Sequence, residues 1–61
     1  MNDDEQAVAI LLRLEESGWN NVVQHGDYWH IVTLSNGDRK VSEEGYKFLE
    51  VVQRAEEQVT K

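Results

Sequence analysis

The chain has 61 residues, no cysteine, and a net charge of −6 from twelve acidic and six basic side chains. This length fits one small domain, 1–61, and the acidic balance argues against direct binding to nucleic-acid phosphates or to anionic membrane surfaces. The longest apolar run is far shorter than a membrane span, the first residues are acidic rather than basic, and cysteine is absent, so we expect a cytoplasmic protein.

The first predicted element is a helix that begins near residue 3. Asn2 or Asp3 can cap it, Asn2 and Glu5 have the spacing of a capping box, and the acidic residues of the first turn favour the positive end of a helix. Ser17-Gly18 ends the helix, because glycine readily adopts the left-handed conformation that follows a helix C-terminus.

This helix carries two apolar stripes where one would cover a core. The core-facing stripe consists of Ala7, Ile10, Leu11 and Leu14. Val8 and Leu12, four residues apart, form a second stripe on another side. The second stripe needs a further neighbour, which is either another element of the same chain or a partner.

Three runs of β-forming residues follow, at 19–25, 28–34 and 38–41. Asn36-Gly37 lies before the third run and predicts a hairpin with a type I′ turn, while Gly26-Asp27 is a weaker signal of the same kind. The three runs predict an antiparallel meander.

Two-residue turns would give the sheet a core face and a second face. The expected core face carries Trp19, Val23, Tyr28, Val32, Leu34 and Val41, and the second face carries Val22, Trp29, Ile31, Thr33 and Lys40. The second face is more apolar than a solvated sheet surface requires. A bulge at Gly26-Asp27 would change the facing of the first strand, which stays open.

A final helix is expected over about 43–58, with Ser42 as N-cap and with Val41 and Tyr46 as a hydrophobic staple. Its apolar stripe consists of Gly45, Phe48, Leu49, Val52, Ala55 and Val59, and its opposite side carries the i,i+4 pairs Glu43/Lys47, Glu50/Arg54 and Glu57/Lys61. The elements together predict an α+β fold of order α-β-β-β-α, a three-stranded antiparallel meander packed with two helices.

No residue pattern in the chain indicates catalysis. The serines and threonines have no base partner at a recognisable spacing, and the chain is too short for a deep cleft between two carboxylates. His25 and His30 come near each other across the first hairpin, but a metal site would need at least a third ligand. We therefore expect no enzymatic activity, no metal and no cofactor.

The surplus of apolar surface is the feature that points to a function. We expect a non-catalytic protein-binding module, such as an adaptor, an inhibitor or an accessory protein of a phage or mobile element, that occupies the surface of a partner protein. The expected partner-binding residues are the apolar Val8, Leu12, Trp29 and Ile31, with Glu5, Glu15 and Glu16 at the rim.

Two alternative functions stay open. The acidic rows could mimic nucleic acid and inhibit a nuclease or another nucleic-acid-binding enzyme. The chain could also be a structural homodimer. We expect self-association at micromolar or higher concentration, because a domain of this size is only marginally stable alone and one small core does not easily absorb the apolar surfaces Val8/Leu12 and Val22/Trp29/Ile31.

Overall fold

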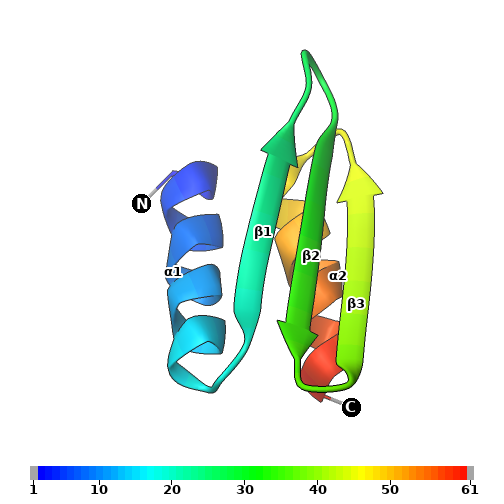
Figure 1. Cartoon of the computed structure of the whole chain (residues 1–61). Helices are drawn as coiled ribbons and strands as arrows, with labels where there is room; N and C mark the ends of the chain where they lie inside the picture. Colours follow the sequence, from blue (N-terminus) through cyan, green and yellow to red (C-terminus); the bar gives the residue numbers. More distant parts are fainter. Residues whose placement is uncertain (1, 61) are drawn as a thin grey trace.

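A computed structural model of the chain describes residues 2–60. The elements in chain order are α1 (Asp3–Glu16), β1 (Asn20–His25), β2 (His30–Asn36), β3 (Arg39–Gly45) and α2 (Phe48–Thr60). The strands form one antiparallel sheet in the order β1-β2-β3 (Figure 1). The predicted α+β class and element order are confirmed.

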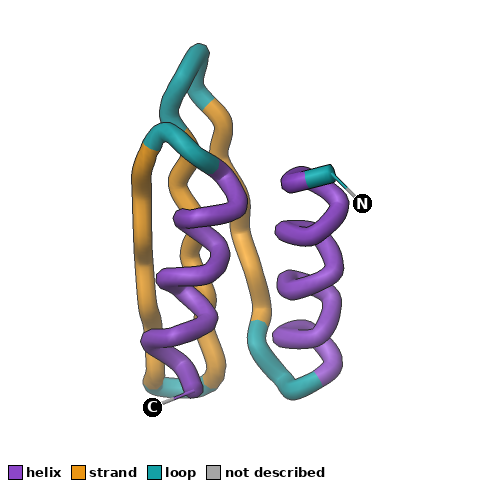
Figure 2. Tube along the Cα trace, turned by 180° about the vertical axis from the view of Figure 1, so that it is seen from behind, coloured by secondary structure: helices purple, strands orange, loops and turns teal. Residues whose placement is uncertain are grey.

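One face of the sheet carries the helical layer and the other is open. Helix α2 covers β2 and β3, while α1 runs alongside β1 and packs chiefly on α2 (Figures 1 and 2). The core between these elements consists of Ala7, Ile10, Leu11, Leu14, Trp19, Val32, Leu34, Val51, Val52, Ala55 and Val59. Apart from Val51, which the predicted stripe omitted, these residues belong to the predicted core faces.

Both ends of α1 are held by the predicted local signals. The Asn2 side chain accepts a hydrogen bond from the Glu5 backbone N–H at 2.8 Å and donates one to the Glu5 carboxylate at 3.3 Å. At the other end Gly18 has φ +98°, and the Trp19 N–H reaches the Leu14 carbonyl at 2.9 Å. This is the Schellman arrangement, and it turns the Trp19 side chain into the core.

The first hairpin differs from the prediction in the length of its loop. His25 pairs with His30, so four residues, 26–29, connect the strands, and the Gly26 N–H donates to the Trp29 carbonyl at 2.7 Å. The prediction of Tyr28 on the core face is therefore wrong, since its side chain is 79% exposed in this loop. Two extra loop residues leave the alternation of the strands unchanged, and Val23 faces the core opposite Val32 without a bulge.

The second hairpin has its turn one residue later than predicted. Asn36 pairs with Arg39, which makes Gly37 and Asp38 the central residues. Gly37 has φ +60°, and no residue other than glycine has a positive φ among residues 2–60. A positive φ at the first central position alone is the pattern of a type II′ turn, so the predicted type I′ turn is wrong.

The boundary between the sheet and the last helix is also corrected. Ser42 pairs with Thr33 and Glu43 with Val32, so β3 continues to Gly45, and α2 begins only at Phe48. Ser42 is not an N-cap. The capping pattern is a local signal, and here pairing along the whole length of the buried central strand outweighs it.

The longer strand changes the ion pairs as well. Glu43 lies on β3 and cannot form a helical pair with Lys47; instead, the Arg54 Nε lies 3.6 Å from the Glu43 carboxylate. Arg54, the expected partner of Glu50, also donates to the Glu44 carbonyl at 2.6 Å. Arg54 thus fastens α2 to the end of β3. The predicted Glu57/Lys61 pair includes Lys61, which is outside the described residues.

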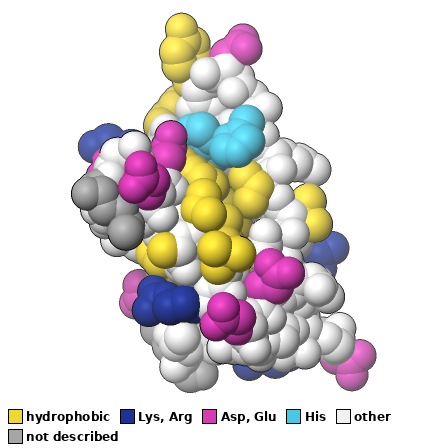
Figure 3. Space-filling view, turned by 90° about the vertical axis from the view of Figure 1, so that its left-hand side faces the viewer, with side chains coloured by type: hydrophobic (Ala, Val, Ile, Leu, Met, Phe, Trp, Pro, Cys, Tyr) yellow, Lys and Arg dark blue, Asp and Glu magenta, His cyan; other side chains and the backbone are white. Residues whose placement is uncertain are grey.

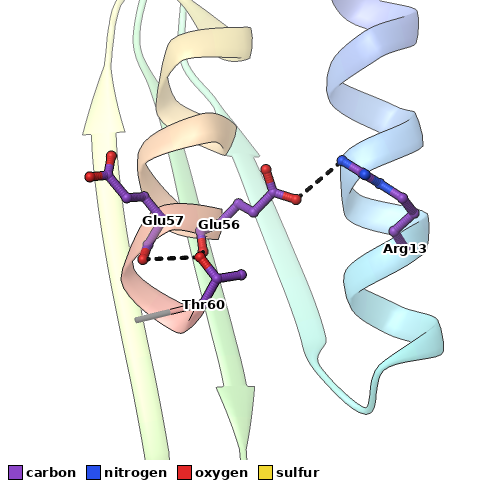
Figure 4. Close-up of polar contacts among 4 residues, drawn as sticks. All are labelled: Arg13, Glu56, Glu57 and Thr60. Carbon is purple, nitrogen blue, oxygen red and sulfur yellow. Dashed lines mark hydrogen bonds and ion pairs between the residues drawn. The ribbon is translucent and has the colours of Figure 1, made fainter.

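A second ion pair joins α1 to α2. The Arg13 guanidinium of α1 lies 3.1 Å from the Glu56 carboxylate of α2 (Figure 4). In the same view the Thr60 hydroxyl donates to the backbone carbonyls of Glu56 at 3.0 Å and Glu57 at 3.4 Å. Because both charged groups of the ion pair are partly exposed, it contributes at most about 1 kcal/mol.

Candidate binding surface

The second apolar stripe of α1 remains uncovered in the folded chain. The side chains of Val8 and Leu12 are 48% and 54% exposed, although each lies next to residues that are buried. With Ala9, Asp4 and Glu5 they line a shallow hollow of about 330 Å³ whose walls are almost wholly apolar. We call these five residues the α1 surface.

Hydrophobic side chains gather in the middle of the molecule's α1 side (Figure 3). Acidic and basic side chains surround them, and the two histidines lie above them in this view. The arrangement of an apolar centre with a charged rim is typical of a protein interface.

The rim of the α1 surface is acidic. Asp4 and Glu5 lie at its N-terminal end, while Glu15 and Glu16 are exposed on the last turn of the helix. The basic residue of α1 is Arg13, whose guanidinium pairs with Glu56 on α2. The negative charge of α1 is therefore largely uncompensated, and this side of the molecule attracts cationic groups.

Trp29, an expected centre of the partner-binding patch, lies elsewhere. It belongs to the first hairpin loop, is half-buried, and packs edge-on against Tyr46 with ring centroids 4.6 Å apart. The two aromatic rings line a different hollow, together with Glu44, Gly45, Lys47, Glu50 and Arg54. This pairing is not predictable from the sequence, because the capping pattern predicts Tyr46 in the first turn of a helix.

Ile31 lies on the open face of the sheet, half-buried, between Gln24 of β1 and Glu44 of β3. Val22 is 56% exposed on the same face. Most of their neighbours on this face are polar, namely Asn20, Gln24, Thr33, Ser35, Lys40, Ser42 and Glu44. The predicted set is thus divided: Val8, Leu12 and Glu5 lie together, whereas Trp29 and Ile31 belong to other surfaces.

The two histidines meet as expected. Their Nδ1 atoms are 2.7 Å apart, and their ring centroids are 4.9 Å apart at an interplanar angle of 81°. The Phe48 ring packs on both, with centroids 5.2 Å from His25 and 5.5 Å from His30. Within residues 2–60, however, no group of three or more His, Cys, Asp or Glu side chains is placed to hold a metal ion.

A comparison with protein-family models, curated proteins and solved structures finds no match to this chain. Neither helix of the described residues is long and apolar enough to cross a membrane.

Proposed function

We propose that this protein is a non-catalytic binding module that holds a partner protein on the α1 surface. The observation that carries the proposal is the exposed pair Val8 and Leu12 in a hollow with apolar walls and with Asp4 and Glu5 at its N-terminal end. The partner that fits has apolar side chains flanked by lysine or arginine, as one face of a basic amphipathic helix does.

The apolar centre supplies most of the binding energy in this proposal. Val8 and Leu12 are each about half exposed, so removing them from water contributes roughly 1 kcal/mol from each. Truncation to alanine in the bound state costs more than this, because it also leaves a cavity in the interface. The acidic rim contributes mainly to the rate of association and to the choice of partner, because exposed charges are screened by water and salt.

The charge of α1 argues against a second copy of the chain as the occupant. Helix α1 carries five acidic residues and one basic residue, so two copies meeting on this surface would bring like charges together. A basic partner relieves this repulsion. Homodimerisation through the α1 surface is less favoured for this reason, and it is an alternative outcome of the test.

Mimicry of nucleic acid is the other alternative. It would place the recognition in rows of carboxylates and would leave the apolar stripe without a role. Two of the carboxylates, those of Glu43 and Glu56, already face arginine side chains of the same chain. The apolar-centred proposal uses both the stripe and the acids around it.

Affinity capture with three matched baits tests the proposal. The baits are the wild type, a V8A/L12A variant and a V22A variant, which loses an equally exposed valine from the open sheet face. Circular dichroism checks that all three remain folded. We expect a partner that the wild type and V22A retain and V8A/L12A loses.

Two results would count against the proposal. Retention of the same proteins by all three baits would remove the α1 surface from the interaction. Release of the partner by added DNA or RNA, with loss of binding in an E15K/E16K variant, would favour mimicry of nucleic acid.

A further inference from the structure

We propose that His25 and His30 form a binding site for a divalent transition-metal ion of the copper(II) or nickel(II) class. The two residues face each other directly across the β1–β2 ladder, and their Nδ1 atoms converge to 2.7 Å. Imidazole nitrogen is a preferred ligand of these ions. The site adjoins the α1 surface, because Asp4 of that surface also lines a hollow with His30, but it does not depend on the function proposed for the α1 surface.

The pair is held in place by packing on the side of the core. The Phe48 ring at the start of α2 contacts both imidazoles. On the other side His25 is exposed and His30 is half-buried, and Figure 3 shows the two side by side at the surface. The rings are therefore oriented by the protein yet accessible to an ion from solvent.

The two Nδ1 atoms lie close enough together to occupy adjacent coordination positions on one ion. With metal–nitrogen bonds of about 2.0–2.1 Å, two ligands at a right angle have nitrogens about 2.9 Å apart, whereas two tetrahedral ligands have them about 3.3 Å apart. The 2.7 Å between the two Nδ1 atoms is a hydrogen-bond distance, shorter than both values, so the rings move slightly apart when an ion binds. Right-angle ligands occur in the tetragonal and square-planar sites of copper(II) and nickel(II), while structural zinc is tetrahedral.

The charges around the pair favour a cation. His30 lines a hollow with three acidic side chains, Asp3, Asp4 and Glu50, and one basic side chain, Lys47. The acids exceed the base, and the chain as a whole carries −6. A divalent ion therefore enters a region of negative potential.

The metal takes the position of a shared proton. At 2.7 Å one Nδ1 carries a hydrogen and donates it to the other, which accepts. When the ion binds, that hydrogen moves through solvent to Nε2 of the same ring, and both Nδ1 lone pairs are free to coordinate. Because the hydrogen moves only within one ring, this exchange of tautomers releases no proton.

The remaining coordination positions belong to water. No third side chain among residues 2–60 completes a ligand cluster, so the third protein ligand that a zinc site requires is absent, and the ion proposed here is held by two imidazoles and water. Such a site is exchangeable, and it links β1 to β2 near the end of their hairpin.

Titration of the full chain with nickel(II) by calorimetry, and electron paramagnetic resonance with copper(II), test the proposal. The variants are H25A and H30A, and Y28A is the matched control because it changes the same hairpin without removing a nitrogen ligand. We expect one ion per chain and coupling of copper to two nitrogens in the wild type and Y28A. Each histidine variant should weaken binding at least about tenfold, since even outer-shell partners of a metal contribute that much.

A melting experiment provides an independent readout. Nickel(II) should raise the melting temperature of the wild type and of Y28A, because an ion that binds only the folded hairpin stabilises it, and should leave H25A unchanged. His25 is exposed, so we expect H25A to fold even if H30A does not, and the test can then be read from H25A alone. Nickel(II) binding that is unchanged in both H25A and H30A would overturn the proposal. So would a D3N/D4N variant that loses binding as fully as the histidine variants although both histidines are intact.

Discussion

Helix α2 packs closely on β3 at Gly45, where there is little room for a side chain. A Cβ atom there would lie 2.9 Å from Arg54 Nη2 and 3.1 Å from Val51 Cγ2. We predict that G45A lowers the free energy of unfolding by about 1 kcal/mol, because Val51 must shift and the Arg54 guanidinium must move away from the Glu44 carbonyl to make room for the methyl group. G26A is the control, because its Cβ would meet only ordinary contacts at 3.6 Å or more. Equal urea midpoints for the two variants would show that α2 does not pack so closely on β3.

At this scale the sequence predicts residues well where local chemistry decides their place. Asn2 and Gly18 adopt their predicted capping roles because both depend on neighbours within a few positions. Tyr28 is misassigned because its facing depends on the loop length, which is settled by the pairing of His25 with His30. Alternation along a strand reveals which residues share a face, but it does not reveal where the strand begins.

Among the elements, α1 has the most clearly identified local support. The Asn2 side chain caps its first turn at 2.8 Å from the Glu5 nitrogen. We predict that N2A lowers the free energy of unfolding by about 1 kcal/mol and speeds amide hydrogen exchange in the first turn. N20A, which changes an exposed asparagine on β1, should have a smaller effect. An unchanged exchange rate in N2A would mean that the cap does not hold the helix.

The boundary between β3 and α2 shows where prediction of elements fails. Ser42 and the acids after it resemble a helix start, but the same residues complete a ladder with β2. A local pattern cannot reveal that a buried strand needs a partner along its whole length. The later turns of α2 depend on helical periodicity alone, and Val52, Ala55 and Val59 are buried as predicted.

For the whole molecule, charge governs contact between copies. The chain carries −6, and five of its acids lie on α1. The self-association expected from the sequence stays a prediction. Because copies of the chain repel each other, we expect it to be absent at low ionic strength and to strengthen as salt screens the charges. Sedimentation equilibrium at low and high salt measures this. A dimer that weakens in high salt would contradict the expectation, because it would depend on attraction between opposite charges.

The candidate site was partly predictable at this scale. The i,i+4 spacing of Val8 and Leu12 revealed a stripe in excess of the core, and both side chains are exposed. Ile31 lies on the second sheet face as predicted, but Trp29, predicted on the same face, lies in the four-residue loop, whose length depends on the pairing of His25 with His30. Tyr46, which is 72% exposed beside Trp29, is absent from the predicted site. The capping pattern at Ser42 predicts Tyr46 in a helix, whereas β3 continues to Gly45.

The affinity of a captured partner for four forms of the chain tests the central claim most directly. The forms are the wild type, L12A, V22A and E15K/E16K, each measured at low and high salt. We predict that L12A costs about 2 kcal/mol or more, as for a central anchor, and that V22A costs almost nothing. E15K/E16K should cost less than L12A, and its loss should shrink in high salt. A dominant loss from E15K/E16K, with L12A near wild type and nucleic acid competing for the partner, would contradict the account.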